Sequence, residues 1–403
     1  MLSVAPFRAV RPSRDKAHLV ATRSYVSYTT RQLRDKLTEN PFSFLHIIHP
    51  DMSATKLHKT ANLEDRFVQV RKKYERFLQD EILIREEKPA YYIYRQTKGG
   101  HPFTGIICAV SVQDYLEGKI KIHEQTLAKR EETFVKYLDT TNINAEPVLL
   151  MSENSHVIED IFEKYLNTRA EYDFTTTTKA RHQLWIIDDD ADIKKVTDAY
   201  AKMSALYIAD GHHRSSSSAR LAQMRRDSGK QSYASEYCLA YVLAETNVRI
   251  YEYNRIVKDL NGLSEEDLLR ALSQSFYVNE APSHYKPMGK GEFSMYLNKQ
   301  WYALNLKHHE NKLDAQVLSD LVLQPILGIG DLRKDKRISF LEGPKGMEGL
   351  KHAIDKNKGG VAFGLFPVAI QEIKHIADEH LTMPPKSTWV EPKLRSGLVV
   401  YEL

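Results

Sequence analysis

The segment Ala205-Leu-Tyr-Ile-Ala209, followed by Asp210-Gly-His-His-Arg214, decides the predicted fold in the middle of the chain. The first five residues form a short apolar run of the kind found in buried strands. The next five are mostly polar, and a helical pattern runs from about Ser215 to Asp227. The sequence therefore predicts a strand that ends in a polar loop and continues as a helix.

The residues before this segment also alternate between strand and helix patterns. Gln183–Ile187 has the pattern of a strand, and Asp192–Ser204 has the pattern of a helix. The resulting order of strand, helix, strand, loop and helix indicates an α/β domain. The serines at positions 215–218 are candidates for the N-cap of the last helix.

The rest of the chain adds strands and helices on both sides. Further strands are predicted at 44–50, 90–96, 103–112, 146–151, 244–257 and 360–366. Further helices are predicted at 55–86, 126–138, 157–166, 264–275, 313–324 and 368–380. The fold class is α/β in the broad sense, a mixed α+β protein.

Length, net charge, cysteine content and hydropathy exclude some classes of protein. The 403 residues favour two or three domains, and the net charge of +4 is too small and too scattered for a dedicated nucleic-acid binder. Cys108 and Cys238 lie in apolar runs and are expected to be buried, reduced thiols. Residues 1–24 carry arginines without an apolar core, and no run is long enough to span a membrane. We expect a cytoplasmic protein without membrane contact.

The polar loop Asp210–Arg214 has the residues needed to bind phosphate. Gly211 permits a tight turn, the following helix N-terminus favours anions, and Arg214 offers a charged fork. Asp210 is a candidate metal ligand or proton acceptor, and His212 and His213 are candidate phosphate donors or metal ligands. Ser215 extends this predicted anion site. The alternative is an ordinary helix start with charged neighbours.

A second candidate group follows Ile120-Lys-Ile122. His123 would lie on the polar face with Lys121, and Glu124 would lie just before a helix. A carboxylate in that position can act as a general base or a metal ligand. The spacing is equally compatible with a capped helix start.

Two further groups lie near the C-terminus. Lys386, Ser387 and Thr388 follow two prolines, and Lys393 comes shortly after them. These lysines and hydroxyls could bind an anion, but they lack the glycines of a phosphate loop and could instead form a clasp packed on the core. Arg337 is a candidate substrate contact, with a structural ion pair as the alternative. The chain has no G-x-S-x-G, G-x-G-x-x-G, H-E-x-x-H or C-x-x-C motif, which argues against serine hydrolases, dinucleotide enzymes and zincins.

Taken together, these residues make the whole chain resemble the domain-of-unknown-function family numbered 1015. The landmarks that carry the resemblance are Ala5-Pro-Phe-Arg8, Tyr91-x-x-Tyr-Arg-Gln96, Gly105, Asp114-Tyr115, Gly118-Lys-Ile120, His123-Glu124, Pro147, Leu184-Trp185, Ala209–Arg214, Arg337-Ile338, Gly343, Met383–Thr388, Pro392-Lys393 and Gly397-Leu398. The Asp-Gly-His-His-Arg element also resembles the signature of ParB-like free-serine kinases.

The resemblance implies a ParB/sulfiredoxin-like nucleotide-binding core with additional α/β regions. It implies an N-terminal region at 1–145, the core with the polar loop at 146–260, and a C-terminal region at 261–403 that closes on the site. By residue match, Asp210, Gly211, His213 and Arg214 would hold phosphates and Mg²⁺, and Glu124 would be the base. The donor would be ATP or ADP and the acceptor free L-serine, giving O-phospho-L-serine.

The chain departs from the family pattern at two places. An N-terminal Pro-Pro-Tyr-Asp segment is replaced by Val20-Ala-Thr-Arg-Ser-Tyr25, and a Thr-His-Arg is replaced by Tyr253-Asn-Arg255. Two other functions stay open: a ParB-like nucleotide-dependent DNA-binding or nuclease protein, and a nucleotide or metabolite sensor without turnover. A homodimer also stays open.

Overall fold

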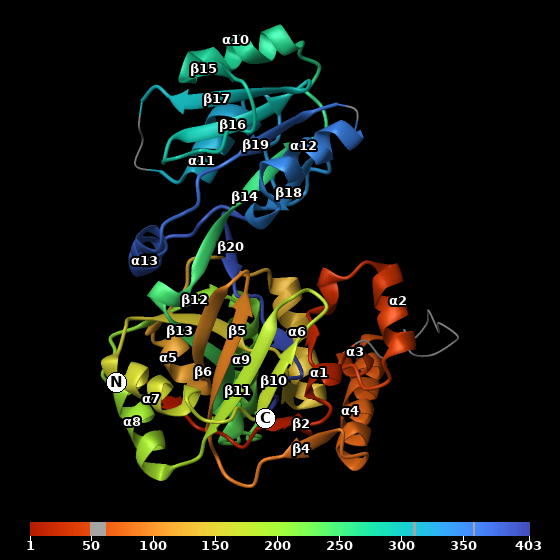
Figure 1. Cartoon of the computed structure of the whole chain (residues 1–403), viewed down its shortest axis with the longest axis vertical. Helices are drawn as coiled ribbons and strands as arrows, with labels where there is room; N and C mark the ends of the chain where they lie inside the picture. The colour runs from red at the N-terminus through yellow and green to blue at the C-terminus, as the bar shows by residue number, and fades with distance from the viewer. Residues whose placement is uncertain (49–61, 309–311, 358) are drawn as a thin grey trace. The chain divides into compact units, whose positions relative to one another are not determined.

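The computed structural model describes residues 1–48, 62–308, 312–357 and 359–403. The chain forms two compact units (Figure 1). Unit 1 consists of Met1–Val248 and Pro392–Leu403, and unit 2 consists of Arg249–Glu391. Of the two boundaries expected from the sequence, 145/146 falls within unit 1 and 260/261 falls within unit 2. The return of the chain to unit 1 at Pro392 has no local signal, because it depends on contacts between distant segments.

A nine-stranded sheet forms the centre of unit 1, as far as the described residues show. Its strands lie in the order β10-β11-β5-β6-β13-β9-β12-β7, and β1 pairs with β6. Pairing is antiparallel except for the parallel pairs β13–β9 and β12–β7. The strands are β1 (Val4–Ala5), β5 (Tyr91–Lys98), β6 (His101–Ser111), β7 (Ile120–Lys121), β9 (Val148–Ser152), β10 (Tyr172–Thr175), β11 (Arg181–Ile187), β12 (Leu206–Asp210) and β13 (Tyr237–Ala244).

Continuous apolar runs form the middle of this sheet. All five residues of β9 are buried, and so is Phe103–Val110 in β6. Strands covered on both faces need such runs, whereas half-exposed strands alternate between apolar and polar residues. The helices α7 (His156–Leu166) and α8 (Asp190–Ala201) contribute to the core cluster on one face.

The remaining helices of unit 1 are shorter or lie outside this layer. They are α1 (Ala17–Val20), α2 (Thr30–Glu39), α3 (Leu45–Ile48), α4 (Leu63–Gln79), α5 (Val112–Leu116), α6 (Ala128–Thr141) and α9 (His212–Asp227). Among the residues described, unit 1 also has three two-stranded sheets: β2 (Val10–Pro12) with β4 (Leu83–Arg85), β3 (Thr22–Arg23) with β21 (Arg395–Ser396), and β8 (Ile143–Asn144) with β22 (Tyr401–Glu402). Through β21 and β22 the last residues of the chain are bound into unit 1.

Unit 2 contains its own antiparallel sheet in the order β15-β17-β16-β19-β14-β18, and β20 pairs with the start of β14. The strands are β14 (Arg249–Val257), β15 (Phe276–Ala281), β16 (Glu292–Leu297), β17 (Gln300–Leu306), β18 (Ile338–Glu342), β19 (Val361–Gly364) and β20 (Thr388–Glu391). The helices are α10 (Glu265–Ser275), α11 (Asp314–Leu318) with a wider turn at Ser319–Leu323, α12 (Gly346–Asn357) and α13 (Ile370–Asp378).

Most of the predicted elements are confirmed, but the predicted strand at 44–50 is wrong. Residues 45–48 form the helical turn α3, and His49 and Pro50 lie outside the described residues. The hydroxyl of Ser43 accepts from the N–H of Leu45, and the N–H of Ile47 donates to the carbonyl of Phe44. A buried run this short has no periodicity that separates helix from strand.

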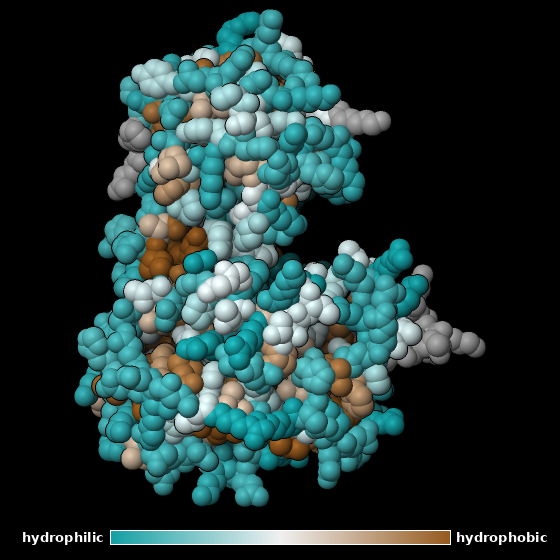
Figure 2. Space-filling view, viewed as in Figure 1, coloured by the Kyte–Doolittle hydropathy of each residue, from teal (hydrophilic) through white to brown (hydrophobic). Residues whose placement is uncertain are grey.

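Two other expectations can be compared with the structure. Cys108 and Cys238 are buried and free, as predicted. The helix predicted at 55–86 is confirmed as α4, but it ends at Gln79, and residues 83–85 form the strand β4. Residues 55–61 lie outside the described residues. None of the helices described is both long and apolar enough to cross a membrane, and the face drawn in Figure 2 is largely hydrophilic.

Candidate functional site

Strand β12 brings the polar loop to one end of the unit 1 sheet. Leu206 and Ile208 are fully buried, which fixes the strand. It pairs in parallel with β7, in the register Leu206↔Ile120. Because parallel neighbours end at the same edge of a sheet, the residues that follow β7 lie beside those that follow β12. This pairing brings His123 and Glu124 to the loop at Asp210–Arg214.

The turn after β12 depends on Gly211. Its φ is +106°, a left-handed conformation that glycine adopts readily. A Cβ at this position would lie 3.0 Å from Nε of Arg214. The carbonyl of Gly211 accepts from the N–H groups of Arg214 and Ser215, so the helix begins immediately.

The start of α9 differs from the prediction. The helix begins at His212 with Gly211 as its N-cap, and no side chain caps it. The serines that the sequence offered as caps lie inside the first turns, and Ser215, Ser217 and Ser218 are buried. Glycine takes the place of a capping side chain because the turn from β12 requires a positive φ. The first N–H groups of the helix therefore lie beside Asp210, at the strand end.

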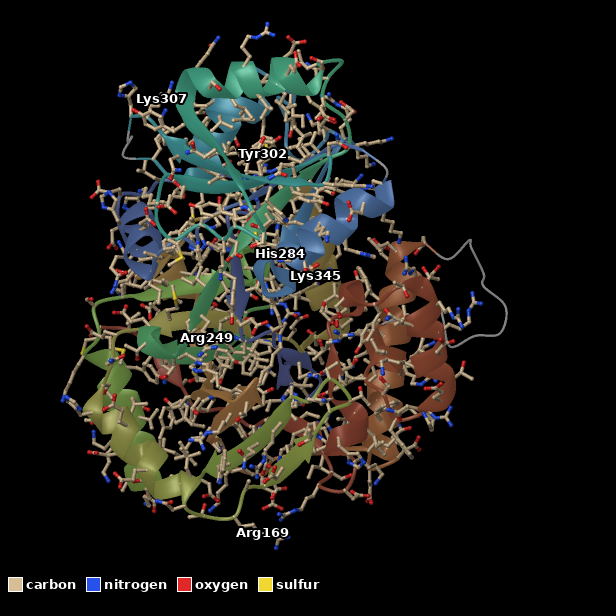
Figure 3. The ribbon with its side chains drawn as sticks, turned by 45° about the horizontal axis from the view of Figure 1, so that its top comes forward. Arg169, Arg249, His284, Tyr302, Lys307 and Lys345 are labelled. Atoms are coloured by element: carbon tan, nitrogen blue, oxygen red, sulfur yellow. The ribbon has the colours of Figure 1, made fainter. Side chains whose placement is uncertain are left out.

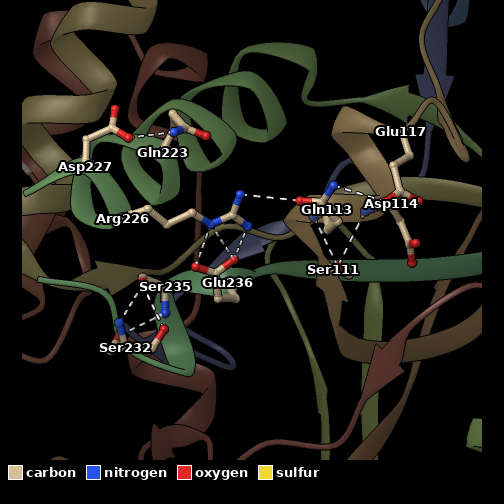
Figure 4. Close-up of polar contacts among 10 residues, drawn as sticks. All are labelled: Ser111, Gln113, Asp114, Glu117, Gln223, Arg226, Asp227, Ser232, Ser235 and Glu236. Atoms are coloured by element: carbon tan, nitrogen blue, oxygen red, sulfur yellow. Dashed lines mark hydrogen bonds and ion pairs between the residues drawn. The ribbon is translucent and has the colours of Figure 1, made fainter. Parts of the chain in front are cut away.

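The other end of α9 is held by an ion pair. Arg226 donates to Glu236 through Nε, at 3.0 Å from Oε1, and through Nη1 to Oε1 of Gln113 at 3.3 Å (Figure 4). Leu221 packs with Val135 and Leu138 of α6. These contacts fix the helix, and with it the position of its N-terminus.

Asp210 is the centre of an ionic group. Its Oδ2 lies 2.9 Å from Nζ of Lys393, and its Oδ1 lies 3.8 Å from Nη2 of Arg214. Arg214 also donates through Nη1 to the carbonyl of Pro147 and lies 3.5 Å from Oε1 of Glu146. Burial alone would raise the pKa of Asp210, but Lys393 and Arg214 lower it to about 2. Asp210 is therefore ionised at neutral pH.

Two neutral histidines lie against this group. The ring centroids of His123 and His212 are 4.5 Å apart with the planes at 83°. Burial lowers the pKa of His123 to about 4, and burial together with His123 lowers the pKa of His212. Within the described part of the chain, Nδ1 of His123 is buried and has no hydrogen-bond partner.

The contacts of His212 define its tautomer. The backbone N–H of His123 points to Nε2 of His212 at 3.5 Å, so Nε2 accepts. The proton then lies on Nδ1, 3.6 Å from Oε2 of Glu124. The Glu124 side chain is 46% exposed, so its carboxylate can be reached from solvent.

Some residues of the site were not singled out from the sequence. Glu146 and the carbonyl of Pro147 precede β9, which is antiparallel to β12 and so begins where β12 ends. Glu131 of α6 accepts from the hydroxyl of Thr126. That hydroxyl, with smaller effects from Ser216 and His213, lowers the pKa of Glu131 despite partial burial. Knowing that β9 lies beside β12 would have pointed to Glu146, but the order of the strands in the sheet cannot be read from the sequence.

The other predicted site residues belong to unit 2. Nζ of Lys386 lies 5.1 Å from the ring centroid of Tyr253, the hydroxyl of Ser387 donates to the carbonyl of Pro384 at 2.7 Å, and Thr388 begins β20. Nη2 of Arg337 lies 2.9 Å from Oδ2 of Asp335. The loop residues are thus held by contacts within unit 2, and Lys393 is the member of the C-terminal group that meets Asp210.

The donor set restricts the kind of metal site. Among the described residues, no three or more His, Cys, Asp or Glu side chains gather as metal ligands. Mg²⁺ in phosphoryl-transfer enzymes needs only one or two carboxylates, with substrate phosphates supplying other ligands. Oδ1 of Asp210 can supply such a carboxylate ligand. It lies 3.8 Å from Arg214, too far for a hydrogen bond, so that contact does not occupy its lone pairs.

The comparison with protein families identifies the chain. The model of the family described as "Protein of unknown function (DUF1015)" matches residues 4–323. The chain belongs to this family. No curated protein matches it.

Several solved structures are similar at low identity. A free serine kinase in complex with AMP is 15% identical, with a TM-score of 0.37 over 73% of this chain and 91% of that chain. SbnI with a C-terminal truncation from Staphylococcus aureus is 12% identical, with a TM-score of 0.40 over 72% and 85%. A conserved hypothetical protein from Pyrococcus furiosus is 16% identical, with a TM-score of 0.35 over 72% and 91%.

Proposed function

We propose that the protein is a nucleotide-dependent small-molecule kinase that transfers phosphate from ATP or ADP to the hydroxyl of free L-serine. The observation that carries the proposal is the meeting of Asp210, Arg214 and Lys393 with His123 and Glu124 at one edge of the unit 1 sheet. Phosphoryl transfer needs positioning and charge neutralisation more than covalent chemistry. This group offers both.

The phosphates would bind at the start of α9. The free N–H groups of a helix N-terminus attract anions, and Arg214 lies over the same turn. Arg214 is held by the carbonyl of Pro147 and by Glu146, so its guanidinium is oriented before a ligand arrives. His212, His213 and Ser215 belong to the same turn and complete the proposed phosphate site. Gly211 lets the guanidinium of Arg214 lie close against this turn.

Asp210 would hold Mg²⁺ through Oδ1. When bound, the ion would neutralise charge on the transferred phosphoryl group. Lys393, which pairs with Oδ2 in the protein without ligand, would then be able to contact a phosphate oxygen. Lys386, Ser387 and Thr388 remain proposed phosphate ligands on the strength of their chemistry alone. The contacts of Arg337 to Leu327, Gly328 and Asp335 favour the structural role that the sequence left open for it.

Glu124 would accept the proton of the acceptor hydroxyl. Its carboxylate is accessible, and the Nδ1–H of His212 lies 3.6 Å from Oε2. His212 and His123 are neutral, so they add no positive charge that would weaken the base. We propose that His123 contacts the acceptor through its buried Nδ1.

Phosphorus NMR of the purified protein with Mg²⁺, L-serine and ATP or ADP tests the proposal. A phosphoserine resonance that is lost in Arg214→Ala is the expected result. Nucleotide binding with no phosphoserine from either donor would contradict the kinase and favour a sensor. DNA binding that weakens steeply with salt would favour the ParB-like alternative.

A further inference from the structure

A cavity of about 540 Å³ lies at the other edge of the unit 1 sheet. It is open to solvent and is lined by α1, the loop after α7 and the strands β10 and β11. Its volume falls in the range of small-molecule sites. β10 is the first strand in the sheet order and β7 is the last, so the cavity is separate from the group around Asp210.

The acidic side chains of the cavity are already neutralised. Oε1 of Glu171 lies 2.9 Å from Nη1 of Arg11, and its Oε2 lies 3.6 Å from Arg14. Asp173 forms a two-pronged pair with Arg181, at 2.8 and 2.6 Å. These carboxylates are therefore poor partners for a cationic ligand.

The basic side chains of the cavity are less engaged. Within the described residues, His18 and Arg169 have no hydrogen bond or ion pair, and Figure 3 shows Arg169 extending away from the ribbon. Arg14 is 47% exposed and donates to the carbonyl of Ala170 at 3.0 Å. Both carboxylates that line the cavity, Glu171 and Asp173, pair with arginines outside the lining, Arg11 and Arg181. An anion would be the favoured ligand.

The cavity also has an apolar wall. Trp185 lies in it, with its Nε1–H donating to the carbonyl of Thr168 at 3.2 Å. The guanidinium of Arg95 lies 5.9 Å from the ring of Trp185. Leu166 and Phe174 extend this wall. Trp185 itself is 3% exposed and packs in the core of unit 1, so the apolar surface open to a ligand comes from the half-buried Leu166 and Phe174.

We propose that this cavity binds a small organic anion, with an oxyanion head at Arg14, His18 and Arg169 and an apolar body against Leu166 and Phe174, in front of Trp185. The head can be a carboxylate or a phosphate ester, since both match a guanidinium fork. The site does not depend on the proposed kinase activity. It is an additional site of unit 1 whose ligand chemistry follows from its basic side chains and its apolar wall.

Calorimetric titration of the full chain with benzoate, phenyl phosphate and benzamide tests this assignment. The three probes share a ring and differ in the head: carboxylate, phosphate or uncharged amide. We expect one or both anions to bind and benzamide to bind more weakly. Arg169→Ala should weaken anion binding about fivefold, as expected for one partly exposed ion pair. Arg31→Ala, at a side chain 93% exposed on α2, should leave it unchanged.

Trp185 reports where the probe binds. The chain has three tryptophans, so Trp301→Phe with Trp389→Phe leaves Trp185 as the single emitter, and the anion should alter its fluorescence. Binding of only one anion identifies the head that the site takes. Absent anion binding, equal binding of benzamide, or an unchanged affinity in Arg169→Ala would overturn the proposal. The Arg169 titrations use a surface variant, so they decide the matter even if the double tryptophan variant does not fold.

Discussion

Arg214 in unit 1 and Arg337 in unit 2 both donate to backbone carbonyls and both face carboxylates, but their partners come from different places. Arg337 bonds the carbonyls of Leu327 and Gly328 and the carboxylate of Asp335, all within ten residues of it. Contacts to residues this close in sequence stabilise a local turn. Arg337 also lies 3.4 Å from Asp259, a distant residue of the same unit. From the sequence, a structural ion pair was one of the two interpretations of Arg337. The pair with Asp335 agrees with that interpretation.

The surroundings of Arg214 are drawn from four separate segments. They bring together His123 and Glu124 after β7, Glu146 and Pro147 before β9, the loop at 210–214, and Lys393 near the C-terminus. A contact that only stabilises a turn can be made by residues close in sequence. A site that positions a ligand needs groups on several rigid elements. The two arginines make similar contacts, and they differ in how many separate segments of the chain supply the groups around them.

The largest expected effect is at Glu124, which should act on turnover. Glu124→Gln keeps the size of the side chain and removes the base, so kcat should fall by about 10² to 10⁴. The KM for the nucleotide should change little, because Glu124 is assigned to the acceptor hydroxyl. Steady-state kinetics with each substrate varied measures both. An unchanged kcat would remove Glu124 from the reaction.

Gly211 offers a sharper test of the site turn. Gly211→Ala should destabilise the fold by about 1–2 kcal/mol, because alanine is strained at positive φ. It should also lower activity, since the added Cβ would displace Arg214. Urea unfolding and kcat/KM measure the two effects.

The same helix provides the matched control for this glycine. Gly229 follows α9 with φ +66°, and a Cβ there would meet no atom within 4 Å. Gly229→Ala should have a comparable backbone strain and nearly normal activity. Equal losses of activity in both variants would mean that the effect comes from helix stability rather than from the position of Arg214.

An effect on stability alone is a pH dependence that comes from His123. Burial lowers its pKa from 6.5 to about 4 in the folded protein. The unfolded chain therefore binds the extra proton between these values, and stability must fall as the pH falls from about 6.5 to about 4. The full contribution is about 3 kcal/mol.

His123→Phe should flatten the stability profile in this window. Urea midpoints at pH 7 and pH 4.5 should differ less in this variant than in the unchanged chain. His18→Phe, at an exposed side chain, should leave the difference unchanged. A full pH slope in His123→Phe would show that other groups, such as the buried His182, account for it.

Much of the fold follows from local pattern. The hairpin of β5 and β6, the strand before Asp210 and the helices α7 and α8 are predicted because each has its own periodicity and turn residues. The helix α9 is predicted from its place between the polar loop and Gly229. The polar loop and its glycine are also visible in the sequence. The N-terminus of α9 was placed at Ser215 because serines are strong caps, but the positive φ of Gly211 moved it to His212.

The remaining features depend on strand pairing, which local pattern does not encode. The pairing of β7 with β12 brings Glu124 to His212. The return of the chain at Pro392 brings Lys393 to Asp210 across 183 residues. Lys386 and Lys393 looked alike in sequence, and only the tertiary structure separates them.

The most direct test of the central claim compares Arg214→Ala with Arg337→Ala in the phosphorylation of L-serine, each with a parallel unfolding curve. Removing Arg214 should lower kcat/KM by about 10² or more while the chain stays folded, as for other preorganised donors to a developing charge. Removing Arg337 should shift the unfolding midpoint down and leave kcat/KM close to that of the unchanged chain. Full activity in Arg214→Ala, or its loss in Arg337→Ala with the fold intact, would contradict the placement of the phosphate site at the start of α9.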